Sequence, residues 1–69
     1  MEKKLNPFVY QKPTEKSIMD ITNIRDKCNE LYDLLCTSVP QSREKSLAIT
    51  KLEEVSMWAN KAIVFNQYN

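Results

Sequence analysis

The sequence predicts an all-α protein: an antiparallel two-helix hairpin with an extended N-terminal arm, assembling into a helical oligomer. Apolar residues recur every three or four positions in two long stretches, a spacing typical of helices, and Pro40 lies between the stretches. Pro7 and Pro13 restrict the backbone before the first stretch. The second stretch has an apolar side of roughly 200°, about twice what one neighbouring helix covers. Because the chain offers only one other helix, we expect further copies to cover the remainder.

The composition argues against several classes of function. The 69 residues include no Gly and no His, which removes glycine-dependent phosphate loops and the usual general base near neutral pH. A net charge of +1 is unlike the basic footprint of proteins that bind nucleic-acid polymers. No apolar run approaches the ~18 residues of a membrane span, and no signal peptide is visible. We therefore expect a soluble, cytoplasmic protein with no membrane partner.

A chain this short gains little stability from its own core, rarely more than ~3–5 kcal/mol. Small proteins therefore recruit disulfides, metals or partners. Cys28 and Cys36 lie about 12 Å apart along one predicted helix, too far for a disulfide, and we expect both to be buried and reduced. Two cysteines without His do not make a zinc site. With no metal or cofactor predicted, partners remain as the source of stability.

The arm is predicted over residues 1–13, with no regular helix before Thr14. Its apolar residues are too frequent for a free disordered segment; they are Leu5, Phe8, Val9 and Tyr10. In one interpretation they dock on the helices as a packing strap. In the other, Tyr10 presents a ring, and Lys12 beside it a positive charge, to a ligand. We favour the strap for Phe8 and keep both interpretations open for Tyr10.

The first helix is predicted over residues 15–37, with Thr14 as its N-cap and Glu15 in its first turn. Its apolar stripe consists of Ile18, Ile21, Ile24, Cys28, Leu31, Tyr32 and Leu35. Arg25 interrupts this stripe. In one interpretation, the Arg25 stem packs on the seam while the guanidinium reaches the rim or pairs with a carboxylate of Asp26, Glu53 or Glu54. In the other, the cation binds an anion at the seam.

A turn over residues 38–41 is predicted to precede a second helix over residues 42–66 and a frayed tail over residues 67–69. So short a connection returns the second helix antiparallel to the first. The apolar side of the second helix consists of Leu47, Ala48, Ile49, Leu52, Val55, Trp58, Ala59, Ala62, Ile63 and Phe65.

Catalysis is not predicted on the second helix. Glu53 and Glu54 are adjacent in sequence, so their side chains point about 100° apart and do not face each other. Asn60 borders the apolar side, either as a buried hydrogen-bonding residue or as a residue that contacts a ligand.

Five segments together resemble a known family. They are Phe8–Thr14 (FVYQKPT), Ile24-Arg25, Pro40–Glu44 (PQSRE), Ser46–Glu54 (SLAITKLEE) and Met57–Ile63 (MWANKAI). Their order and spacing resemble the small phage hairpin-domain family that sequesters cyclic-nucleotide immune signals. This family includes the anti-CBASS sponges and the C-terminal hairpins of the anti-Thoeris sponges. The resemblance spans residues 6–66.

The resemblance implies a hairpin assembled as a homohexamer, a trimer of dimers. Such a protein binds cyclic dinucleotides such as cyclic GMP–AMP and does not cleave them. Some members also bind cyclic trinucleotides at a separate site. It would block activation of CBASS effectors in the cytoplasm of an infected bacterium. Relatives in the anti-Thoeris branch hold a cyclised ADP-ribose, and the longer ones carry an N-terminal β-rich region. The short arm of this chain is more similar to the anti-CBASS branch.

Together, the residues and the resemblance predict a set of ligand contacts: Phe8, Tyr10, Lys12, Arg25, Arg43, Thr50 and Asn60. By position, Tyr10 corresponds to a tyrosine that stacks on a base, and Arg25 to a basic residue that meets phosphate. The family often has His where Gln11 stands and an acidic residue where Gln41 stands, so this chain departs from the pattern at both positions.

Two functions of other classes are alternatives. The chain could be a helical interaction module whose wide apolar side docks on a protein partner, with Arg25 in a salt bridge and Tyr10 in a strap. It could also be a small enzyme that degrades such nucleotides, which has less support because the usual catalytic groups are missing.

Overall fold

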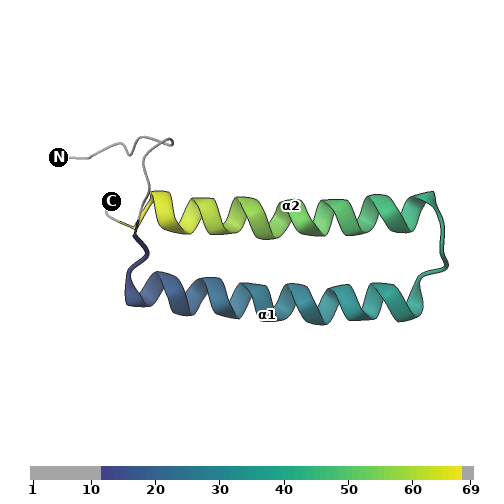
Figure 1. The fold of residues 1–69 in the computed structure, drawn as a ribbon, viewed down its shortest axis with the longest axis horizontal. Helices are drawn as coiled ribbons and strands as arrows, with labels where there is room; N and C mark the ends of the chain where they lie inside the picture. The colour runs from purple at the N-terminus through teal and green to yellow at the C-terminus, as the bar shows by residue number, and fades with distance from the viewer. Residues whose placement is uncertain (1–11, 68–69) are drawn as a thin grey trace.

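The computed structural model describes residues 12–67, and these form two antiparallel helices, α1 (Glu15–Ser38) and α2 (Arg43–Phe65), packed side by side (Figure 1). The all-α hairpin predicted from the periodicity is thereby confirmed. Residues 1–11, with Phe8 and Tyr10, lie outside the described part of the chain.

Local hydrogen bonds set the ends of both helices. The Thr14 hydroxyl oxygen accepts from the Ser17 N–H at 3.1 Å, and the Ser42 hydroxyl oxygen accepts from the Lys45 N–H at 3.1 Å. Each cap satisfies an N–H that has no partner within its helix. Lys45 also donates through Nζ to the Cys36 carbonyl at 3.3 Å, which places a positive charge where the α1 dipole is negative.

The end of α2 departs from the expected frayed tail. Gln67 was predicted to belong to that tail, whereas its side chain forms three hydrogen bonds: two with Thr14 and Ser17 at the start of α1, and one with Lys12, which precedes the helix. The Asn66 side chain also donates to the Ala62 carbonyl at 2.8 Å, which satisfies a carbonyl at the helix end. The tail prediction is therefore wrong at residue 67.

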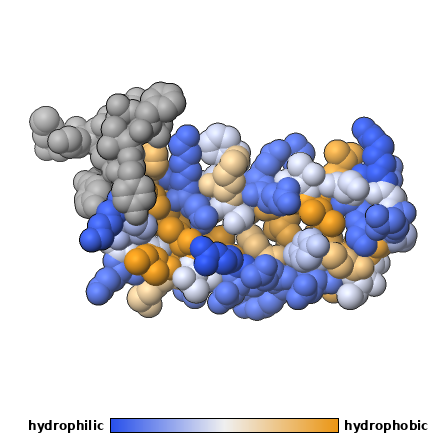
Figure 2. All heavy atoms as spheres, viewed as in Figure 1, coloured by the Kyte–Doolittle hydropathy of each residue, from blue (hydrophilic) through white to orange (hydrophobic). Residues whose placement is uncertain are grey.

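The two helices leave most of their apolar surface open to solvent. No hydrophobic side chain within residues 12–67 is fully buried, and Ser17 is the buried residue, with 4% of its surface exposed. Hydrophobic residues are visible along the line between the helices, with hydrophilic residues on the outer edges (Figure 2). One helix-to-helix contact covers a narrow strip of each partner, so a single hairpin forms a seam rather than a core.

The predicted apolar stripe of α1 is wider than this seam. Ile18 is 52% exposed, and Leu31 and Tyr32 are each 45% exposed. Ile21, Ile24 and other members of the stripe are half-buried. Cys36, expected to be buried, is exposed. The physical reason is angular: side chains that lie farther around α1 from the direction of α2 are only partly covered by it.

Candidate functional site

Arg25 lies on the rim of a small groove between the helices, which we call the Arg25 groove. The groove has a volume of about 180 Å³ and is lined by Arg25, Cys28, Asn29, Tyr32, Ile49, Leu52, Glu53 and Ser56. Residues of both helices contribute because the antiparallel arrangement places the middle of α1 beside the middle of α2. Cys28 and Leu52 form its floor at the seam, and polar groups surround the floor.

The guanidinium of Arg25 forms none of the ion pairs found within residues 12–67. Those pairs join Lys16 to Asp20, Lys27 to Glu30 and Lys51 to Glu54. Of the two interpretations of Arg25, pairing with Asp26, Glu53 or Glu54 is therefore not observed. Arg25 is exposed and lines the groove, which fits both remaining interpretations: a guanidinium that reaches the rim, and a cation that binds an anion at the seam.

Three further polar residues of the groove were not singled out from the sequence as site residues. Asn29 and Tyr32 lie four and seven residues after Arg25 on α1, and Ser56 faces them from α2. The spacing alone puts Asn29 and Tyr32 on the same side of the helix as Arg25. Had Arg25 been taken as the reference direction, this spacing would have identified both residues.

The Tyr32 phenol remains neutral at physiological pH. Its pKa is raised, chiefly by hydrogen bonding with the Cys36 side chain and also by the negative charges of Asp33 and Glu53. A neutral phenol both donates and accepts a hydrogen bond. Tyr32 lines the same groove as Arg25, seven residues farther along α1.

The structure places the other predicted contacts at different levels of the hairpin. Asn60 is half-buried and lies one turn beyond Ser56, on the side of α2 that faces the Arg25 groove. Thr50 and Arg43 are exposed. Arg43 lies 13 residues before Ser56, which is about 20 Å along the helix axis. Within one chain, Arg25 and Asn60 lie on one side, and Arg43 is too distant to join them.

Lys12 lies at the opposite end of the hairpin from the turn. It is exposed, and its carbonyl accepts a hydrogen bond from Gln67. The eleven residues from Thr14 to Arg25 span about 16 Å of α1. Tyr10 and Phe8 precede Lys12 and lie outside the described residues. Thr14, at the start of α1, and Arg25 are therefore well separated along the helix.

The Arg25 groove is also small for a nucleotide. Pockets that enclose drug-sized ligands measure about 300–1,000 Å³, against about 180 Å³ here. The Arg25 groove of one chain is therefore not a closed pocket for a nucleotide.

Sequence comparison agrees with this architecture. The family model described as the Acb2/Tad1 hairpin domain matches residues 4–64, which is most of the chain. The chain belongs to the Acb2/Tad1 hairpin family. The family is one of phage sponges that act against CBASS and Thoeris signals, as the resemblance implied. No curated protein and no solved structure matches the chain.

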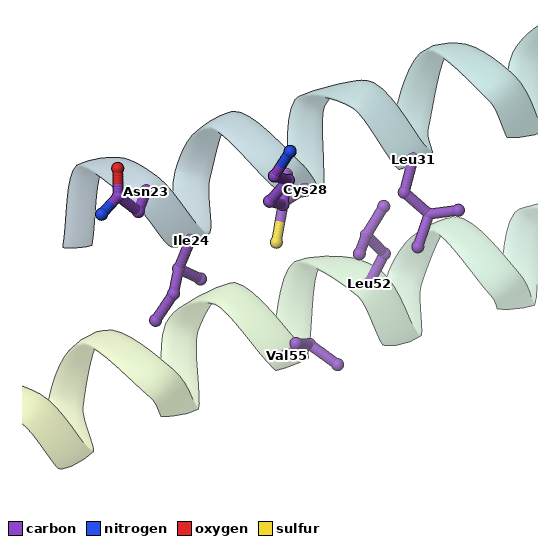
Figure 3. A pocket seen from close by; sticks show the side chains of 7 residues that line it. Asn23, Ile24, Cys28, Leu31, Leu52 and Val55 are labelled. Carbon is purple, nitrogen blue, oxygen red and sulfur yellow. The ribbon is translucent and has the colours of Figure 1, made fainter. Parts of the chain in front are cut away.

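This Acb2/Tad1 hairpin has a second groove on the other side of the seam, which we call the Val55 groove (Figure 3). It measures about 380 Å³ and is lined by Asn23, Ile24, Lys27, Cys28, Leu31, Leu52 and Val55. Cys28 and Leu52 line both grooves, so the two grooves lie back to back. The Val55 groove is predominantly apolar, and Val55 itself is 56% exposed.

Neither helix of the described chain has an apolar run long enough to cross a membrane.

Proposed function

We propose that this chain binds and sequesters cyclic di- or oligonucleotide immune signals, such as cyclic GMP–AMP, without cleaving them. Holding the signal would block activation of CBASS effectors in the cytoplasm of a phage-infected bacterium. The observation that carries this proposal is the family match over residues 4–64, since members of this family are sponges for cyclic-nucleotide signals.

The chemistry of the Arg25 groove supports an anionic, aromatic ligand. A cyclic dinucleotide carries two phosphates and two flat bases. The Arg25 guanidinium offers charge-assisted hydrogen bonds in a planar fork that matches phosphate oxygens. Tyr32, Asn29 and Ser56 line the same groove and offer a ring and neutral hydrogen-bonding groups. Tyr10 would add a stacking contact, which contributes roughly 1–3 kcal/mol in single-strand binders.

The distances within one chain support a site shared between copies. Arg25 lies about 16 Å along α1 from Thr14, and Arg43 lies about 20 Å along α2 from Ser56, which lines the same groove as Arg25. A second copy can supply the contacts that one copy holds too far away. Two copies related by a two-fold axis present each group twice, which suits a ligand with two similar halves.

The open apolar surface supports the same oligomer. Burying a side chain such as Val55 or Leu31 stabilises an assembly by roughly 1.5–3 kcal/mol when it was fully exposed before. Both are about half exposed in the hairpin, so each contributes a part of that amount. We propose that the Val55 groove is covered by another copy, in an assembly such as the hexamer of related sponges.

Binding should appear first as stabilisation of the folded protein. A ligand held only by the native state at 100 times its Kd adds about 2.7 kcal/mol. For a domain of this size we expect the melting temperature to rise by about 10 °C or more. The measurement is a thermal melt, followed by calorimetric titration, with cyclic di- and trinucleotides and a cyclised ADP-ribose.

Recovery of the ligand separates a sponge from an enzyme. We expect heat denaturation of the complex to release the nucleotide intact. A cleaved product would indicate the degrading enzyme. A response to the cyclised ADP-ribose alone would place the chain with the anti-Thoeris function.

A protein-interaction module is the second candidate function, and the open Val55 groove is the observation that favours it. A module of this kind would show no thermal shift with any nucleotide of the panel. It would also remain monomeric until its partner was added, since the groove would be reserved for that partner.

The Glu53 carboxylate should weaken phosphate binding in the Arg25 groove, because it brings a negative charge to the groove that holds the cation. We expect Glu53→Gln to tighten the binding of cyclic GMP–AMP about two- to fivefold, the range of exposed charge interactions. Calorimetry at low and high salt measures this, and the gain should shrink as salt screens the charge.

Glu54→Gln is the matched control for Glu53→Gln. Glu54→Gln removes the same charge one position along α2. The Glu54 side chain points about 100° away from that of Glu53 and pairs with Lys51 at 3.7 Å. We expect little change in affinity from it. Weaker binding in Glu53→Gln would contradict the electrostatic argument and would assign the carboxylate to a hydrogen bond with the ligand.

A further inference from the structure

A polar cluster joins the two helices at the end of the hairpin that lies opposite the turn (Figure 1). The Gln67 Oε1 accepts from the Ser17 hydroxyl at 2.7 Å and from the Thr14 N–H at 3.1 Å. The Thr14 and Ser17 hydroxyl oxygens lie 2.9 Å apart, and the Thr14 oxygen also accepts from the Ser17 N–H at 3.1 Å. We call these three residues the clasp, because they join the chain just after α2 to the start of α1.

The hydrogen-bonding groups of the clasp allow one arrangement of its protons. An amide oxygen can only accept, so the Ser17 hydroxyl donates its single proton to Gln67 Oε1. The Thr14 hydroxyl then donates its own proton to the Ser17 oxygen. Rotating the Gln67 amide by half a turn would set its NH2 group against the Thr14 N–H. The same rotation would set its oxygen against the Lys12 carbonyl, which accepts from Nε2 at 3.0 Å. The clasp therefore holds the Gln67 amide in one orientation.

The clasp includes the buried residue of the described chain. Ser17 is 4% exposed, whereas no hydrophobic side chain within residues 12–67 is fully buried. Every buried side-chain nitrogen or oxygen within these residues has a hydrogen-bond partner. Burial keeps water from replacing the partners of the Ser17 hydroxyl, so the loss of one partner is more costly here than on the surface.

The clasp restricts the two helices in a way that their apolar contact does not. Apolar packing is not directional, whereas hydrogen bonds have preferred distances and angles. The turn holds the helices together at one end, and the 24 residues of α1 span about 36 Å from there to the other end. The clasp therefore defines the separation and the rotation of the helices at the end that the turn does not hold.

Both grooves lie between the turn and the clasp. On α1, Arg25 lies eight residues after Ser17, which is about 12 Å along the axis. On α2, Ser56 lies 11 residues before Gln67, which is about 16 Å. Residues of both helices line each groove, so the shape of each groove depends on how the helices align. A change at the clasp reaches the grooves by tilting α2 relative to α1.

We propose that the clasp is a conformational lock, which holds the helices together at the open end and thereby sets the alignment that forms both grooves. Ser17 and Gln67 are its positioning residues, one from each side of the seam. Gln67 lies beyond residues 4–64, which the family model matches, so the clasp adds a contact to the matched hairpin. The alignment exists before any ligand binds, so the lock operates whichever ligand the grooves accept.

Methyl NMR of the full chain without ligand tests the lock, with helical circular dichroism as the check of folding. Gln67→Ala removes the acceptor that Ser17 and the Thr14 N–H share. We expect the methyl signals of Ile24 and Leu52, which lie on facing helices and line the larger groove, to move from their wild-type positions.

Two variants are controls for Gln67→Ala. Gln67→Glu loses the donor to the Lys12 carbonyl but keeps an acceptor oxygen for both clasp donors, and its negative charge is favourable at the start of α1. Thr37→Ala removes a hydroxyl whose hydrogen bonds, to the Asp33 and Leu34 carbonyls, stay within α1. We expect both variants to keep the wild-type methyl signals.

A thermal double-mutant cycle tests whether Ser17 and Gln67 act as one unit. We expect Ser17→Ala to lower the melting temperature by about 4–8 °C, the effect of one hydrogen bond in a domain of this size. Gln67→Ala should lower it at least as much. The double variant should fall by less than the sum of the two shifts, because the bond between the two residues can be lost only once.

Wild-type methyl signals in Gln67→Ala would overturn the proposal, because Gln67 would then cap α1 without setting the alignment. Additive melting shifts would contradict it too, as would methyl changes in Thr37→Ala as large as those in Gln67→Ala. If Gln67→Ala does not fold, Ser17→Ala takes its place in the same methyl comparison, since it removes one hydrogen bond between the helices and leaves the Gln67 side chain intact.

Discussion

Val55→Asp should dissociate the oligomer that we propose. Val55 lines the larger, apolar groove and is 56% exposed in the hairpin. In an assembly that covers this groove, the substitution removes the free energy that burial of the valine contributes to association. It also places an unpaired charge in an apolar contact, which costs several kcal/mol more. We expect association at least about a thousandfold weaker, measured as mass in solution by sedimentation.

Met57→Asp is the control for this experiment. Met57 is 53% exposed and lies two positions along α2, about 200° around the helix from Val55. We expect the oligomer to persist in Met57→Asp, with helical circular dichroism retained in both variants. An oligomer that survives Val55→Asp would exclude the Val55 groove from the contact between copies.

The ends of the helices could be predicted because local chemistry sets them. Thr14 and Ser42 cap the helices, because each hydroxyl oxygen accepts a hydrogen bond from the N–H three residues later. Pro40 prevents α1 from continuing. The predicted ranges, residues 15–37 and 42–66, differ from the observed ones by one residue at three ends. Gln67 could not be predicted in this way, since its partners lie more than 50 residues away.

The candidate site was predictable only where one helix suffices. Arg25 was identified because a cation interrupted an apolar period on α1. Ser56 lies on α2, and its place in the same groove depends on how the two helices align, which periodicity does not define. The roles of Phe8 and Tyr10 stay predictions, because both residues lie outside the described chain.

Arg25→Ala should weaken the binding of cyclic GMP–AMP about 10- to 100-fold. Hydrogen bonds to charged groups contribute about 1.5–3 kcal/mol each, and the guanidinium is the cation that lines the groove. Tyr10→Ala should have a comparable effect through lost stacking. Calorimetry measures the affinities, and sedimentation should show an unchanged oligomer in both variants.

Arg25→Lys and Lys51→Ala define what Arg25 contributes. Arg25→Lys keeps the charge but loses the planar fork, so we expect an affinity between those of the wild type and Arg25→Ala. Lys51→Ala also removes one positive charge, yet Lys51 pairs with Glu54 at 3.7 Å and does not line the Arg25 groove. A loss of affinity in Lys51→Ala equal to that in Arg25→Ala would mean that net charge, not the Arg25 groove, attracts the nucleotide. Unchanged affinity in both Arg25→Ala and Tyr10→Ala would remove the assigned site while leaving the sponge function to be located elsewhere on the hairpin.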